Sequence, residues 1–160
     1  MPENKIVIVY HSQQAGNTRA AAELVAKGVR EGGAFEVVLA NTNDGRVDPR
    51  ILGGCVGAAF GTPDYYSYPA GGMKQFMDDW LFLKEAGKEQ ISGMPVALFI
   101  THGGGGKAQK PHEELFRRIG PQVGKTVSVR GRPEGKDAEA CVALGRELAR
   151  AAQRHVGQKR

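Results

Sequence analysis

Hydrophobic and polar positions along the chain follow two periods. Short apolar runs occupy residues 5–10, 35–40, 55–61, 95–101 and 126–130. In the first of them, Ile6 to Val9 are all β-branched, with no polar residue between them, which is typical of a strand buried on both faces. We therefore predict five strands, of which at least the first lies inside a parallel sheet.

The segments between these runs carry apolar residues three and four positions apart, as expected of helices that cover a sheet. One such set is Ala22, Val25, Ala26 and Val29, and a second is Met73, Phe76, Met77 and Trp80, with Trp80 predicted in the core. A third follows over residues 138–152, and a short VDPRIL segment after an NDG turn predicts one helical turn. Strands that alternate with helices predict an α/β fold with helices on both faces of the sheet.

Length and composition narrow the class of protein. The 160 residues, 41% of them hydrophobic, predict a single domain over residues 1–160. No apolar run approaches the roughly 18 residues of a membrane span, and the opening MPENK lacks an apolar signal segment. We therefore expect a cytoplasmic protein with no membrane partner. Cys55 and Cys141 lie far apart in apolar surroundings, which favours buried thiols over a disulfide.

The net charge of +5 is concentrated in one part of the chain. Lys and Arg balance Asp and Glu, 13 to 13, over residues 1–124, and exceed them by 9 to 4 over residues 125–160. No aromatic residue follows Phe116, whereas single-stranded nucleic-acid sites interleave basic and aromatic side chains. We interpret the basic segment as a solvated helix face and expect no nucleic-acid partner.

Three loops at the predicted carboxyl ends of the strands have unusual compositions, and ligands of open parallel sheets bind at that edge. The first loop, HSQQAGNT at residues 11–18, holds hydroxyl and amide side chains and a glycine directly before a helix. Helix amino ends present unpaired N–H groups, so this loop predicts a phosphate site made of neutral donors. An ordinary helix cap by Ser12 or Asn17 is the alternative.

The second loop brings Tyr65, Tyr66 and Tyr68 together after a strand that we expect to end in a sharp turn at Gly61-Thr62-Pro63. Clustered tyrosines suggest a flat aromatic ligand, with Tyr68 also able to pack on the body of the protein. The third loop, THGGGGKA from Thr101, lets the main chain approach a ligand closely, or is simply mobile.

Common nucleotide and metal motifs are absent. THGGGGKA has Thr101 where a Walker A loop needs glycine and Ala108 where it needs a hydroxyl, and the first loop has no G-x-G-x-x-G. His102 is a candidate donor at the ligand edge. We expect His112 to face solvent at a helix start and His155 to belong to the basic segment, so no metal site is predicted.

Together these loops resemble those of the flavodoxin-like flavoproteins, and most closely the Trp repressor-binding-protein and multimeric flavodoxin branches. HSQQAGNT is similar to the S/T-x-x-x-G-N-T phosphate loop, and GTPDYYSYPAGGMKQFMD is similar to the G-T-P-x-x-x-x-x-x-A-G-x-M-K/R-x-F-x-D block. The segment from Thr101 to Gly106 matches the S/T-x-G-x-G-G loop. The resemblance implies a three-layer α/β/α sandwich with a five-stranded parallel sheet in the order 2-1-3-4-5.

The same resemblance implies FMN as the cofactor and assigns residues to it. Around the phosphate it places Ser12, Gln13, Gln14, Gly16, Asn17 and Thr18. Along the isoalloxazine it places Thr62, Pro63, Asp64, Tyr65, Tyr66 and Ser67. At the other edge of the flavin it places Thr101, His102, Gly103, Gly104, Gly105 and Gly106.

Some features depart from the family. Short electron-carrier flavodoxins are typically acidic, whereas Lys107 and Lys110 flank the third loop here, which puts partners of the usual basic type in doubt. Only GRPEGK separates the last strand from the last helix, so the insertion of long-chain flavodoxins is absent. The segments that build the tetramer of related quinone reductases are also absent. A homo-oligomer is left open, but that assembly is not expected.

The resulting hypotheses concern flavin redox chemistry. The first is an NAD(P)H-linked reductase of quinones or similar acceptors, and the second is a carrier that moves electrons between redox proteins. The flavin carries the chemistry in both, with His102 and Tyr66 as candidate proton donors and no certain catalytic residue. A flavin-free domain that binds another phosphorylated ligand is the third hypothesis.

Overall fold

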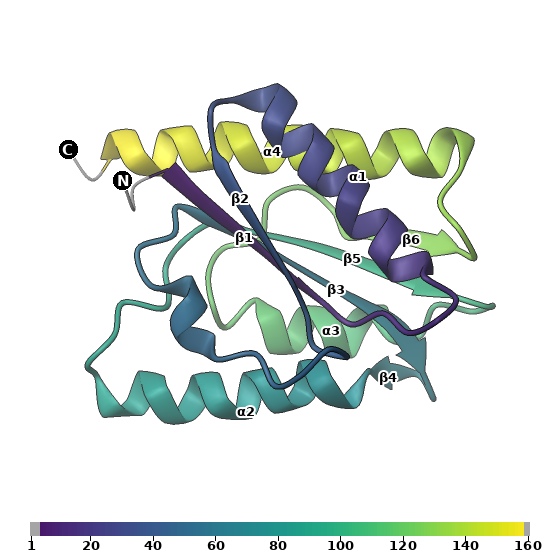
Figure 1. Cartoon of the computed structure of the whole chain (residues 1–160), viewed down its shortest axis with the longest axis horizontal. Coiled ribbons are helices and arrows are strands. Elements are labelled where there is room, and N and C mark those ends of the chain that lie inside the picture. Colours follow the sequence, from purple (N-terminus) through teal and green to yellow (C-terminus); the bar gives the residue numbers. More distant parts are fainter. Residues whose placement is uncertain (1–3, 159–160) are drawn as a thin grey trace.

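Residues 4–158 are described by a computed structural model, shown in Figure 1. Its strands are β1 (Lys5–Tyr10), β2 (Glu36–Asn41), β3 (Gly57–Tyr65), β4 (Tyr68–Pro69), β5 (Val96–His102) and β6 (Val127–Arg130). The helices are α1 (Asn17–Gly32), α2 (Gly71–Ala86), α3 (Gln109–Phe116) and α4 (Gly135–Gln158), with a 3₁₀ turn, η2 (Pro49–Leu52). The VDPRIL segment therefore forms the helical turn predicted from its sequence.

The five parallel strands lie in the order β2-β1-β3-β5-β6, which confirms the predicted flavodoxin-like sheet. Helices α1 and α4 cover one face of the sheet, and α2 and α3 cover the other (Figure 1). Because the strand order reverses at β1 and β3, the loops that follow these two strands diverge at the carboxyl edge and leave room between them.

The predicted sharp turn at Gly61-Thr62-Pro63 is wrong. Strand β3 continues to Tyr65, and Thr62 and Pro63 stay in register with Ile100 and Thr101 of β5. Proline fits extended backbone and forfeits only one ladder hydrogen bond, so the strand passes through it near its end. The chain then reverses into the short strand β4, where Tyr65 is paired with Tyr68.

The contact between α1 and α4 depends on two glycines. A Cβ atom on Gly28 would collide with the carbonyl oxygen of Val142, and one on Gly145 would collide with that of Val25. The two helix backbones therefore lie closer together than any side chain would allow. Buried residues of both helices pack on the sheet beneath them and form one of the two cores.

The second core lies between the sheet and α2 and α3. Trp80 is buried there, as predicted, and its indole N–H donates to the carbonyl of Ile91 at 2.8 Å. Cys55 and Cys141 are both buried and form no disulfide, also as predicted. Over residues 4–158, no helix is both long and apolar enough to cross a membrane.

The expectation that His112 faces solvent is wrong. Its side chain is fully buried, Nε2–H donates to the carbonyl of Phe60 at 2.9 Å, and the ring lies against Phe116. His112 and Phe116 are one helical turn apart, so both lie on the face of α3 that packs on the sheet. Burial lowers the pKa of His112 to about 4, so the imidazole is neutral at pH 7.

Candidate functional site

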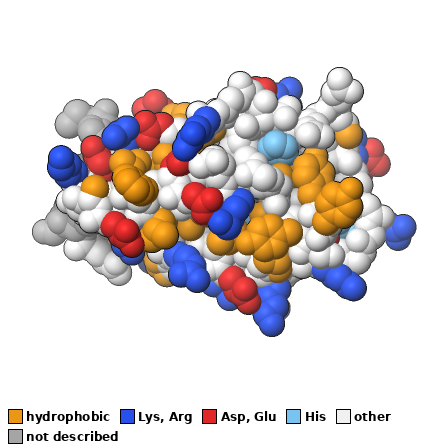
Figure 2. All heavy atoms as spheres, turned by 90° about the horizontal axis from the view of Figure 1, so that it is seen from below, with side chains coloured by type: hydrophobic (Ala, Val, Ile, Leu, Met, Phe, Trp, Pro, Cys, Tyr) orange, Lys and Arg blue, Asp and Glu red, His pale blue; other side chains and the backbone are white. Residues whose placement is uncertain are grey.

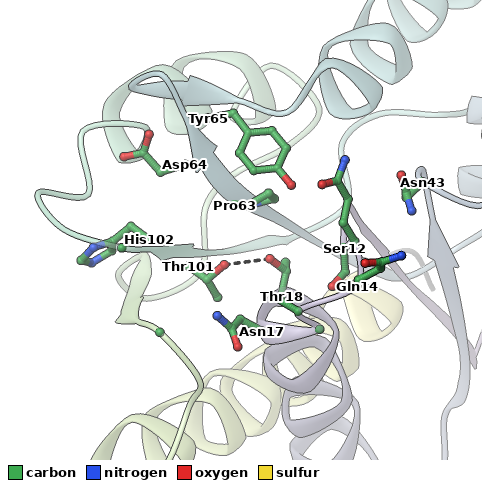
Figure 3. Close-up of a pocket in the computed structure, with 15 residues that line it drawn as sticks. Ser12, Gln14, Asn17, Thr18, Asn43, Pro63, Asp64, Tyr65, Thr101 and His102 are labelled. Atoms are coloured by element: carbon green, nitrogen blue, oxygen red, sulfur yellow. Dashed lines mark hydrogen bonds between the residues drawn. The ribbon is translucent and has the colours of Figure 1, made fainter.

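A cavity of about 590 Å³ opens at the carboxyl edge of the sheet, where all three loops singled out in the sequence meet (Figure 3). The first loop supplies one wall, the end of β3 supplies a second, and the end of β5 supplies a third. Its lining residues are Ser12, Gln13, Gln14, Ala15, Gly16, Asn17, Thr18, Asn43, Pro63, Asp64, Tyr65, Thr101, His102, Gly103 and Gly131.

The buried amide of Asn41 fastens the first loop. Its Oδ1 accepts from the N–H of Ser12 at 2.9 Å and of Asn43 at 3.0 Å, and its Nδ2 donates to the carbonyl of Ser12 at 2.9 Å. Asn41 is the last residue of β2, so it ties the loops after β1 and β2 together. The sequence analysis missed this residue because an Asn after an apolar run usually signals only a turn.

The amino end of α1 is only partly capped. Gly16 is the N-cap residue and offers no side chain, so an ordinary cap by Ser12 or Asn17 is not formed; Ser12 Oγ nevertheless accepts from the N–H of Arg19 in the first turn, at 3.1 Å. Gly16 precedes the helix with φ 72°, and the amides of Gln14, Ala15, Asn17 and Thr18 have no hydrogen-bond partner within residues 4–158. These free donors, at the positive end of the helix dipole, suit an anion such as a phosphate.

Two hydroxyl groups join the first loop to the third. Thr18 Oγ1 and Thr101 Oγ1 are 2.7 Å apart, and both side chains are buried (Figure 3). Thr18 lies in the first turn of α1 and Thr101 near the end of β5. A hydroxyl can accept one hydrogen bond while it donates another, so Thr18 keeps a proton to offer to a ligand when Thr101 donates to it.

The carboxylate of Asp64 joins the second loop to the third. One of its oxygens accepts from the N–H of Ser67 at 2.8 Å, and the other accepts from the N–H of Ala108 at 3.2 Å. The first bond closes the turn between β3 and β4, in which Tyr66 and Ser67 have φ 57° and 65°. Left-handed backbone at both central positions is typical of a type I′ turn, usually made by Asn and Gly.

The two neighbouring tyrosines have different positions. Tyr65 lines the cavity, and its ring meets His11 edge-on at a centroid distance of 5.9 Å. Tyr66 is fully exposed at the tip of the turn. Burial lowers the pKa of His11, whose Nδ1 is hydrogen-bonded to Thr42 Oγ1 at 2.8 Å, and raises the pKa of Tyr65. The side chains of His11 and Tyr65 are thus both neutral at pH 7.

His102 lies at the rim of the cavity, and Figure 3 shows its ring turned away from the Thr18–Thr101 pair. Its Nδ1 is shielded from solvent and has no hydrogen-bond partner among the described residues, while its carbonyl accepts from the N–H of Gly131 at 2.9 Å. No group of three His, Cys, Asp or Glu within residues 4–158 could hold a metal ion.

Twelve of the residues assigned from the sequence line the cavity, and six do not. Thr62 is buried behind it, where its hydroxyl accepts from the N–H of Ala70 at 2.9 Å. The remaining five lie outside the lining: Tyr66, Ser67, Gly104, Gly105 and Gly106. Asn43, Gly131 and Ala15 are lining residues that the sequence analysis did not name.

A parallel sheet in this order, with a helix amino end and the ring of Tyr65 facing one cavity at its switch point, defines a flavodoxin-like fold. A flavodoxin of Clostridium saccharobutylicum is 37% identical over 97 residues, which cover 61% of this chain and 55% of the relative. The match thus spans about half the length of that curated relative. No protein-family model matches the chain.

Solved structures with the same fold resemble this chain over nearly its whole length. A flavodoxin from the domain Archaea is 26% identical, with a TM-score of 0.79 over 93% of this chain and 99% of that chain. A WrbA-like flavodoxin from Agrobacterium tumefaciens is 20% identical, with a TM-score of 0.76 over 95% and 99%. These likenesses confirm the predicted flavodoxin-like fold.

Proposed function

We propose that the chain binds FMN in this cavity and acts as a redox flavoprotein. The observation that carries the proposal is that the unpaired amides of Gln14, Ala15, Asn17 and Thr18 lie in the same cavity as the ring of Tyr65. The amides fit a phosphate and the ring fits a flat heterocycle, and FMN carries both groups. When bound, FMN supplies the redox chemistry by accepting a hydride or single electrons.

Different residues of the cavity would bind different parts of FMN. The first loop contains no Lys or Arg, so neutral N–H and O–H donors at the helix amino end would hold the phosphate. Tyr65 and Pro63 would pack on the ring system, and aromatic packing of this kind contributes about 0.5–1.5 kcal/mol beyond buried area. The carboxylate of Asp64 would hold the second and third loops in place around the ring.

We infer that the bound flavin transfers electrons between redox proteins. Likeness to two flavodoxins supports this use, one of them over nearly its full length. An NAD(P)H-linked reduction of quinones is the second candidate, and the likeness to a WrbA-like protein favours it. Following the consumption of NADH and NADPH with and without benzoquinone separates the two, since a carrier alone shows no turnover with either nucleotide.

The FMN proposal is tested first, by adding the purified protein to FMN and to riboflavin. We expect flavin fluorescence to be quenched and FMN to bind more tightly, because only FMN presents a phosphate. Absence of quenching with both ligands would overturn the proposal and leave the flavin-free hypothesis. Equal affinities would contradict the role given to the first loop.

A further inference from the structure

A buried histidine outside the cavity lining supports a ring inside it. His11 directly precedes the first loop, and its side chain reaches the ring of Tyr65. The two ring centroids are 5.9 Å apart and the ring planes are at 82°, which is the geometry of an edge-to-face pair. His11 is 8% exposed, whereas Tyr65 is 36% exposed. The ring that lines the cavity thus rests on one that is buried in the protein.

Hydrogen bonds of the backbone and the side chain hold His11 in place. Its N–H donates to the carbonyl of Gly61 at 3.1 Å, which continues the pairing of β1 with β3. Its Nδ1 lies 2.8 Å from Thr42 Oγ1 in a buried hydrogen bond. Thr42 is held in turn, because its N–H donates to the carbonyl of Tyr10 at 2.8 Å. The position of the imidazole is therefore set by strands β1, β2 and β3.

The first turn of α2 leaves room for this pair only because residue 72 is glycine. A Cβ atom on Gly72 would lie 2.6 Å from Thr42 Oγ1 and 3.0 Å from His11 Nδ1. A Cβ atom on the adjacent Gly71 would meet no atom within 4 Å. Gly72 occupies an open position of the G-T-P block, and His11 lies just before the phosphate-loop pattern. The family patterns therefore explain neither residue.

The ring of Tyr65 has few other restraints. Tyr65 is the last residue of β3, where it is paired only with Tyr68 of the two-residue strand β4. Tyr68 is 40% exposed and Tyr66 is fully exposed, and Figure 2, viewed from the side of α2, shows apolar side chains on the surface at this end of the molecule. Within residues 4–158, Tyr65 makes no second ring contact. His11 is thus the aromatic side chain that limits how Tyr65 can turn.

We propose that His11 is a positioning residue for the flavin ring: it holds Tyr65 edge-on, so that a face of the Tyr65 ring is in place for the isoalloxazine before FMN binds. This inference rests on the proposed function for the identity of the ligand. In a perpendicular pair His11 covers at most one face of Tyr65, so at least one face stays open. A side chain that is ordered before binding loses less conformational entropy on binding, which raises affinity.

The substitution His11→Asn separates the two contacts of the imidazole. The Asn side chain can still form a hydrogen bond with Thr42 Oγ1, but it has no ring to support Tyr65. We expect FMN, riboflavin and lumiflavin, which lacks the ribityl phosphate, all to bind roughly three- to tenfold more weakly, with the preference for FMN over riboflavin unchanged. His155→Asn, near the end of α4, is the matched control and should change none of these affinities.

A double-mutant cycle measures whether His11 acts through Tyr65. Tyr65→Leu alone should weaken flavin binding, and His11→Asn should add no further loss in that background, because no ring is left to position. A histidine that only stabilises the fold would cause the same loss in both backgrounds. Gly72→Ala, which should displace Thr42 and His11, should weaken flavin binding as His11→Asn does, whereas Gly71→Ala should leave it unchanged.

Fluorine NMR of the protein labelled with fluorotyrosine tests the inference without flavin. Tyr65→Phe and Tyr66→Phe identify the signals of these two residues by their loss. In His11→Asn we expect the Tyr65 signal to move toward that of the exposed Tyr66, because the ring is released from its support. The signal should stay in place in His155→Asn.

An unchanged Tyr65 signal in His11→Asn would overturn the inference. Equal losses of flavin affinity with and without the Tyr65 ring would do the same, as would equal effects of the two glycine variants. If Gly72→Ala does not fold, the cycle and the NMR signal still decide. A protein that binds no flavin would overturn the proposed function, while the NMR signal would still test the role of His11.

Discussion

The hydroxyl groups of Thr18 and Thr101 meet at 2.7 Å in the floor of the cavity, although 83 residues separate them in sequence. This bond couples the amino end of α1 to the carboxyl end of strand β5. It thereby holds the first loop and the third loop against each other.

Removal of the Thr18 hydroxyl should separate recognition of phosphate from recognition of the ring. We expect Thr18→Val combined with Ser12→Ala to weaken FMN binding roughly tenfold or more and riboflavin binding only slightly, because both hydroxyls lie at the proposed phosphate site. Fluorescence titration with both flavins measures the ratio. Thr18→Ser keeps the hydroxyl and is the control; similar losses for the two flavins would contradict the assignment.

The bonds made by Asn41 should matter for ligand affinity as well as stability. Asn41→Leu leaves the buried N–H of Ser12 unpaired, which costs about 1–3 kcal/mol, and frees the first loop. We expect a lower melting temperature and weaker FMN binding. Asn41→Asp retains both accepted bonds, so it should lie between the wild type and Asn41→Leu in calorimetry and titration.

A glycine at the second central position of the hairpin should stabilise the protein. Ser67 has φ 65°, a region open to glycine at little energetic cost, so Ser67→Gly should raise the free energy of unfolding by about 0.5–1 kcal/mol. Urea denaturation measures this difference. Ser67→Ala keeps a Cβ atom in the same strained backbone and should give no increase; a gain as large as that of glycine would refute the turn geometry.

The buried imidazole of His112 should make stability depend on pH. Its folded pKa of about 4 lies below the unfolded value of 6.5, so the unfolded state binds the proton more readily. Its contribution is complete above pH 6.5 and is lost as the pH falls toward 4, by up to about 3 kcal/mol. Chemical denaturation between pH 4 and 7 measures the loss.

The control for this titration is His112→Gln, whose side-chain amide can donate to the carbonyl of Phe60 without titrating. This variant should be less stable than the wild type at pH 7 and have a flatter pH profile. A slope identical to that of the wild type would assign the pH dependence to other groups.

The sequence predicted all five parallel strands because buried strands and amphipathic helices have distinct periods. It missed β4, since the Tyr66-Ser67 turn carries neither the Asn nor the Gly that signals a two-residue hairpin. The position of His112 was also missed, because a polar residue near a helix start is usually exposed and only its spacing to Phe116 indicated otherwise.

The sequence predicted which loops form the site, but not the hydrogen bonds that hold these loops in place. Composition identified the donors near Gly16 and the ring of Tyr65, but nothing local in the sequence indicated that Asn41 or Thr101 would fasten them. Such contacts depend on how strands far apart in sequence are paired. The same holds for Gly131, which lines the cavity and whose N–H donates to the carbonyl of His102.

The glycine-lined contact between α1 and α4 has a consequence for biosynthesis. The helix whose first turn faces the cavity is held down by residues made more than 100 positions later. A nascent chain that still lacks α4 leaves one side of α1 uncovered, so we expect this face of the sheet to reach its final packing only after the last helix has left the ribosome.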